Sequence, residues 1–104
     1  MILFHYDQGR YFPVVVCDIC EKRIVDAQLG AVVHQQGDLE TETDLLPCIH
    51  AHKGECHDSA EKKIGGRCVW QELSTHFLYL ILNSQLTPEK LAKERDTKDA
   101  AGHF

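Results

Sequence analysis

The chain has 104 residues, of which 43% are hydrophobic and 26% are charged, and we expect one globular domain spanning residues 1–104. The formal net charge of −5 argues against a protein that mainly binds nucleic-acid phosphates, since such proteins usually carry a basic face. Five cysteines are an odd number and many for this length, which favours reduced thiols and metal ligation over a disulfide framework.

The first four residues are apolar, but His5, Asp7 and Arg10 follow at once. This apolar stretch is too short for a signal peptide or for a membrane span. We therefore expect a cytoplasmic protein with no membrane association.

The first third of the chain has the patterns of β-strands. Residues 2–16 contain two apolar or β-branched runs separated by turn-forming residues at 7–10, which predicts an antiparallel hairpin. Pro13 has no backbone N–H, so its strand should lie at an edge. A second hairpin is predicted between residues 24–27 and 31–34, which flank a glycine.

The middle of the chain changes character. Residues 35–44 carry four acidic side chains and no basic one, which predicts a solvated loop. A short strand is expected at residues 45–49, although Pro47 interrupts it. Residues 52–63 have helical composition, and the glycine pair that follows predicts the helix end.

Four residues between positions 17 and 56 have the spacing of metal ligands. Cys17-x-x-Cys20 can form a tight turn whose backbone amides stabilise two thiolates. His52-x-x-x-Cys56 places two ligands on one side of a helical turn. Together they supply the four ligands of a tetrahedral site, and we predict one structural zinc ion per chain.

Other cysteines and histidines are alternatives. Cys48, His50 and His57 lie close to the second pair in the sequence and could replace either of its members. We favour the original pair because only it has the spacing of one helical turn. Cys68 is next to a valine and a tryptophan, so we expect a small buried side chain that is neither a ligand nor part of a disulfide.

The order of these features resembles the treble-clef zinc finger, in which a zinc knuckle and the start of a helix bracket one structural ion. The resemblance covers residues 16–63 and implies that Cys17 and Cys20 are the knuckle ligands, with His52 and Cys56 as the helical ligands. The knuckle lacks the glycine that often follows its second cysteine. The expected fold class is α+β, a small zinc-stabilised domain with N-terminal β-hairpins followed by two to three C-terminal helices.

The C-terminal part, residues 68–100, is expected to be helical. Phe77 and Leu82 bound a run of six consecutive apolar residues inside a helix predicted at 72–86. Such a run covers nearly the whole circumference of a helix, so it needs cover on more than one side. Thr87 and Pro88 have the residue types of a cap and a first helical position, which predicts a last helix.

These features favour a non-enzymatic interaction or regulatory protein. Four protein ligands leave no open position for water on the metal, so the zinc should be structural and the protein is not expected to be an enzyme. The helix around Phe77 and Leu82 would form a homodimer or bind a protein partner. The alternative is a small transcription regulator that binds nucleic acid through a local basic patch. This patch would consist of Arg10, Lys22, Arg23, Lys53, Lys62, Lys63 and Arg67.

Overall fold

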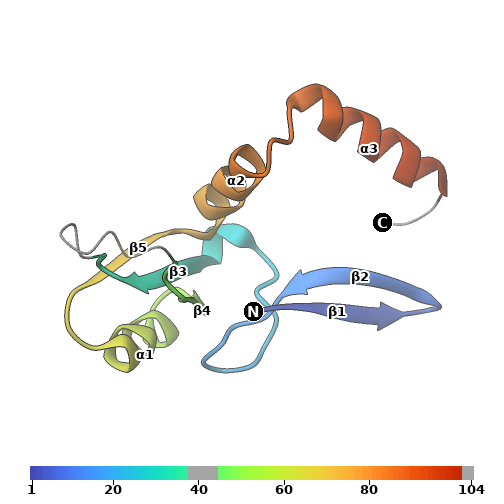
Figure 1. The fold of residues 1–104 in the computed structure, drawn as a ribbon. Helices are drawn as coiled ribbons and strands as arrows, with labels where there is room; N and C mark the ends of the chain where they lie inside the picture. The colour runs from blue at the N-terminus through green and yellow to red at the C-terminus, as the bar shows by residue number, and fades with distance from the viewer. Residues whose placement is uncertain (38–44, 102–104) are drawn as a thin grey trace.

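The computed structural model describes residues 1–37 and 45–101, and it shows a small α+β protein with two antiparallel sheets and three α-helices (Figure 1). The predicted fold class is therefore confirmed, while most of the predicted acidic loop lies outside the described residues. The strands are β1 (Ile2–Asp7), β2 (Arg10–Val15), β3 (Gly30–Gln35), β4 (Cys48–His52) and β5 (Cys68–Glu72). The helices are α1 (Glu55–Ile64), α2 (Leu73–Asn83) and α3 (Pro88–Ala101), and a short 3-10 helix (Ala27–Leu29) precedes β3.

The predicted N-terminal hairpin is present as the two-stranded sheet β1–β2. Its turn contains Gln8 and Gly9 with φ angles of 49° and 78°, and two consecutive positive φ angles match the twist of a tight hairpin. Pro13 pairs with Phe4 in this sheet, where each strand has a free edge. The hairpin projects from the body of the protein (Figure 1). Its Phe4 side chain is 74% exposed.

The prediction of a second hairpin was wrong. β3 is instead the central strand of a three-stranded sheet with the order β4-β3-β5, and both pairings are antiparallel. Residues 24–27 form no named strand; Asp26 caps the 3-10 helix by accepting a hydrogen bond of 2.9 Å from the Gln28 amide. Val32 and Val33 point to opposite faces of β3 and are both buried, so this strand needs partners that a local hairpin cannot provide.

The strand and helix around the second ligand pair begin later than predicted. β4 starts directly after Pro47 and continues to His52, rather than covering residues 45–49. The chain then turns at Gly54, whose φ of 93° lies in the region that favours glycine. α1 therefore starts at Glu55 instead of at the histidine.

The C-terminal part was only partly predicted. Residues 68–72 form β5, not a helix, because they pair with the second edge of β3. The last helix was predicted correctly, since Pro88 is its first residue and Thr87 Oγ1 accepts a hydrogen bond of 3.2 Å from the Lys90 amide. None of the helices in the described ranges is long and apolar enough to cross a membrane.

The core lies where the three-stranded sheet meets α1 and α2. Leu73, Val32, Val33 and Cys17 have the largest fully buried side chains, and Ala60 of α1 joins the same cluster. A candidate metal ligand is thus part of the core itself.

Close packing around Gly30 leads to a stability prediction. A Cβ atom at Gly30 would lie 2.6 Å from Cδ2 of the buried Leu73 and 3.0 Å from Ile24 Cγ2. We expect Gly30→Ala to lower the free energy of unfolding by about 1–3 kcal/mol, as overpacking does, in chemical denaturation. Gly37→Ala is the matched control, because its Cβ would lie at an ordinary 3.5 Å from Leu46 Cδ1. Equal stability of the two variants would contradict the packing argument.

Candidate metal centre

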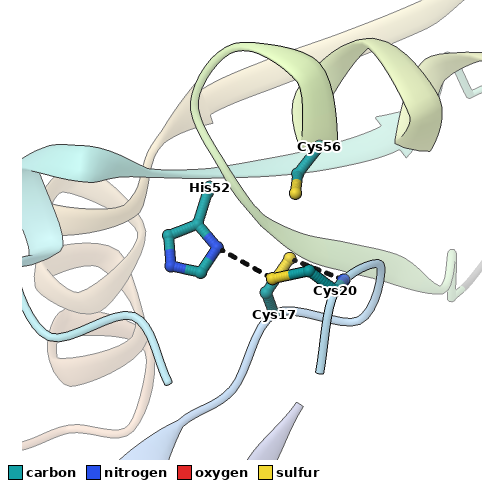
Figure 2. Close-up of side chains that lie close together, drawn as sticks. All are labelled: Cys17, Cys20, His52 and Cys56. Atoms are coloured by element: carbon teal, nitrogen blue, oxygen red, sulfur yellow. Dashed lines mark hydrogen bonds between the residues drawn. The ribbon is translucent and has the colours of Figure 1, made fainter. Parts of the chain in front are cut away.

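Cys17 and Cys20 lie in a tight turn that directly follows the N-terminal hairpin. The Cys17 amide donates to the Lys22 carbonyl at 2.9 Å, and the Glu21 amide donates to the Cys17 carbonyl at 3.0 Å. The Cys20 amide points at Cys17 Sγ over 3.5 Å. The turn therefore brings both sulfurs to one side and places a backbone donor against one of them (Figure 2).

The residue after the second cysteine has a left-handed backbone conformation. Glu21 has a φ of 61°, and this conformation costs a residue with a Cβ roughly 1–2 kcal/mol. Because glycine has no such cost but loses more entropy on folding, we expect Glu21→Gly to raise the free energy of unfolding by about 0.5–1 kcal/mol. Chemical denaturation at saturating zinc measures it. Lys22→Gly, at a neighbouring position without positive φ, should bring no gain, and a gain from both variants would contradict this explanation.

His52 and Cys56 come from two different elements. His52 is the last residue of β4, and Cys56 lies in the first turn of α1. The expectation that both lie in one helical turn was wrong, although the two side chains do meet. Cys56 thereby faces the knuckle from the start of α1.

The four side chains gather around one point (Figure 2). The ligand atoms of Cys17, Cys20, His52 and Cys56 all lie within 4.8 Å of one another. Cys20 Sγ is 3.4 Å from His52 Nδ1, and Cys17 is fully buried. Three thiols and one imidazole form a donor set typical of structural zinc, so this cluster could hold one metal ion.

The His52 ring has a contact that orients it toward this point. Its Nε2 lies 3.2 Å from the carbonyl oxygen of Arg23. A proton on Nε2 satisfies that carbonyl and leaves the lone pair of Nδ1 facing the sulfurs. Metal-bound histidines are commonly held in this way by an oxygen acceptor on their other ring nitrogen.

The thiols of Cys17 and Cys56 differ in pKa. Burial raises the pKa of Cys17, but hydrogen bonds from the Cys20 and His52 amides lower it, and the resulting pKa is about 6. Burial, together with the nearby sulfurs of Cys17 and Cys20, raises the pKa of Cys56 to about 11. At neutral pH the cluster therefore holds a thiolate at Cys17, whereas Cys56 keeps its proton until a cation displaces it.

Two residues lie apart from the cluster: His57, which was an alternative ligand, and Cys68, which was not expected to be one. His57 contacts Glu61 Oε1 at 3.0 Å, and its ring packs edge-on against Trp70 with centroids 5.0 Å apart. Cys68 is half-buried rather than buried, and its thiol donates to the Glu61 carbonyl at 3.6 Å. None of the five cysteines, all within the described residues, forms a disulfide.

The other two alternatives, Cys48 and His50, form a second group. Their ligand atoms and that of His76 lie within 4.8 Å of one another. Burial lowers the pKa of both His50 and His76, whereas burial and the Asp18 carboxylate raise the pKa of Cys48. From the sequence, Cys48 and His50 were expected only as substitutes in the first set, and His76 had no expected role. The one signal in the sequence for this group is the alternation of Cys48 and His50 along a strand.

Comparisons of the chain with protein-family models, with curated proteins and with solved structures find no match. The interpretation of the cluster therefore rests on its own geometry and donor chemistry. Both of these point to metal binding.

Proposed function

We propose that this chain is a non-enzymatic interaction protein whose fold is stabilised by one structural zinc ion. One observation carries the proposal: four ligand atoms, contributed by the knuckle, β4 and α1, lie within 4.8 Å of one another. The ligands would be Cys17, Cys20, His52 and Cys56. A zinc ion with four protein ligands has no open coordination position, which suits a structural role and not catalysis.

The same arrangement supports the resemblance to the treble-clef finger over residues 16–63. A knuckle supplies one ligand pair, and the start of α1 supplies Cys56. The difference lies in His52, which comes from a strand, so the ion would also connect the three-stranded sheet to the knuckle.

The shape of the protein explains why such a cross-link matters. The radius of gyration is 16.0 Å, whereas a compact chain of this length has about 13 Å. An extended small protein buries less apolar surface than a compact one, and a structural metal compensates for the limited core. The proposed ion would join the knuckle to the end of β4 and the start of α1, and Cys20 and His52 are 32 residues apart in the sequence.

A stripe on α2 supports the proposal of an interaction surface. Leu73 is fully buried and Phe77 packs against the core, whereas Leu78, Tyr79 and Leu82 are 53%, 49% and 57% exposed. Tyr79 and Leu82 follow Leu78 by one and four residues, so the three side chains lie together on the side of the helix away from the core. We call these three residues the α2 stripe and propose that it packs against the stripe of a second copy of this chain.

Metal analysis tests the zinc centre directly. Purified protein should lose one zinc equivalent per chain in the Cys17→Ser/Cys20→Ser double variant. Cys68→Ala should retain the full zinc content, since Cys68 belongs to neither ligand group. Unchanged zinc content in the double variant would overturn the ligand assignment.

Nucleic-acid binding is the rival function, and a binding titration separates the two. Two of the basic residues in the predicted patch have partners within the chain: Lys53 forms an ion pair with Glu72, and Arg23 lies over the ring of Phe12. We expect no salt-dependent binding of duplex DNA or of single-stranded RNA by the zinc-loaded protein. Binding that weakens steeply with salt would favour the transcription regulator instead.

A further inference from the structure

One face of β4 carries potential ligands along its whole length. Side chains alternate along a strand, so Cys48, His50 and His52 point to the same side. Ile49 and Ala51, on the opposite side, pack in the hydrophobic core. His52 enters the proposed zinc centre at the end of the strand, which leaves Cys48 and His50 free for a different role.

A helix residue completes this second group. His76 of α2 has its ring edge-on to that of His50, with the centroids 5.5 Å apart. The ligand atoms of Cys48, His50 and His76 are all within 4.8 Å of one another. We propose that these three residues form a second metal site, which binds a zinc ion and leaves a fourth position for water or an external ligand.

The distances suit a zinc ion after small side-chain shifts. In tetrahedral coordination with bonds of about 2.0–2.3 Å, ligand atoms lie about 3.3–3.8 Å apart. In the structure the ligand atoms lie up to 4.8 Å apart. They would therefore have to approach one another by about 1 Å to bind the ion, which side-chain rotation can supply. One thiolate with two imidazoles is a donor set for zinc and its neighbours among the transition metals, and it is a poor one for calcium or magnesium.

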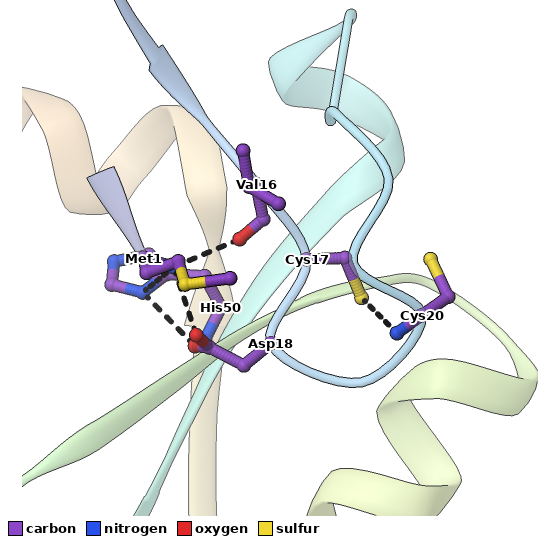
Figure 3. A network of polar contacts seen from close by, with 6 residues as sticks. All are labelled: Met1, Val16, Cys17, Asp18, Cys20 and His50. Carbon is purple, nitrogen blue, oxygen red and sulfur yellow. Dashed lines mark hydrogen bonds and ion pairs between the residues drawn. The ribbon is translucent and has the colours of Figure 1, made fainter. Parts of the chain in front are cut away.

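Both histidine rings are already oriented by neighbouring groups. Nδ1 of His76 lies 3.0 Å from Gln71 Oε1, so a proton on Nδ1 satisfies the amide oxygen and leaves Nε2 for a metal. Nδ1 of His50 lies 3.2 Å from the Met1 amino nitrogen and 3.5 Å from Asp18 Oδ2 (Figure 3). A proton on Nδ1 of His50 would face the Asp18 carboxylate, as outer acceptors do in metal sites, and would leave Nε2 for a metal. The Met1 ammonium is a donor, so it would have to turn away from Nδ1 in that state.

Asp18 connects the two sites. It lies inside the knuckle between Cys17 and Cys20, as Figure 3 shows, and its Oδ2 accepts a hydrogen bond of 2.8 Å from the His50 amide. The Asp18 amide in turn donates to the His50 carbonyl at 2.8 Å. An ion in the first centre would fix the knuckle and, through Asp18, the position of His50. The second site should therefore fill after the first, and more weakly, because it has three protein ligands instead of four.

A cobalt titration of metal-free, reduced protein tests this proposal. Co²⁺ bound by thiolates absorbs through sulfur-to-metal charge transfer, so each site reports its own filling. We expect two equivalents per chain, with strong absorption from the three-thiolate centre first and weaker absorption from the single thiolate of Cys48 second. Cys48→Ser and His76→Gln should each bind one equivalent with the first phase unchanged, and that phase also shows that the variants are folded. Zinc analysis should give the same counts.

Matched controls come from a cysteine and a histidine outside both groups. Cys68→Ser and His5→Gln should retain two equivalents. A wild-type protein that binds only the strongly absorbing equivalent, or a second equivalent that survives in both Cys48→Ser and His76→Gln, would overturn the second site. If only the weak phase appears and Cys48→Ser removes it, the structural centre fails while the second site stands.

Discussion

Removal of zinc from the proposed structural centre should abolish the cooperative thermal unfolding transition of this protein or shift it to a much lower temperature. Structural zinc contributes about 10–16 kcal/mol in small zinc-dependent folds. Whole domains are stable by only about 5–15 kcal/mol. We therefore expect a strong chelator, under reducing conditions, to unfold the finger or to lower the melting temperature by more than about 20 °C. Circular dichroism follows the loss, and added zinc should restore the transition.

Variants separate this effect from non-specific action of the chelator. The Cys17→Ser/Cys20→Ser protein should behave like the chelated wild type even in excess zinc. Cys68→Ala removes only a half-buried thiol that donates to carbonyls at the end of α1, so this variant should melt close to the wild type and respond fully to the chelator. A chelated wild type that keeps its full transition would show that the fold does not depend on the metal.

The sequence predicted the cluster because its signals are local. Cys17 and Cys20 are three residues apart, and the turn between them has few possible shapes. The N-terminal hairpin and the start of α3 were predicted for the same reason, since turn residues at 7–10 and the Thr87-Pro88 pair act on their immediate neighbours.

The errors lie where distant partners decide the structure. Residues 68–72 are a strand only because β3 has a second edge to fill, and no local pattern announces that edge. His52 was assigned to a helix from its spacing to Cys56, whereas pairing of β4 with β3 extends the strand through His52. In both cases the sheet overrides local helical preference.

The second ligand group is the clearest case of a feature that the sequence hides. Cys48 and His50 are separated by one residue, but His76 lies on another element and meets them only because α2 packs on the same sheet. The sequence around His76 has no ligand spacing of its own, unlike the Cys17-x-x-Cys20 pair. The fold is needed to bring them together.

The α2 stripe leads to the second large expected effect, which is the loss of self-association. Wild-type protein should show concentration-dependent sedimentation across the micromolar range, and Leu78→Glu or Leu82→Glu should make it monomeric. Leu78 and Leu82 are each more than half exposed, and burying apolar surface is worth roughly 25 cal/mol per Å². In a twofold dimer each substitution acts twice, so a loss of about 1.4 kcal/mol per copy weakens binding about 100-fold.

The β1–β2 hairpin offers the matched control, because it carries an exposed apolar residue that does not belong to the α2 stripe. Phe4 is 74% exposed, yet Phe4→Glu should leave the dimer intact if the α2 stripe is the interface. Since α2 stays anchored through the buried Leu73, neither leucine variant should change the zinc content or the melting behaviour of the monomer. A wild type that is monomeric at high micromolar concentration, or a dimer that Phe4→Glu disrupts and Leu78→Glu does not, would contradict this interface.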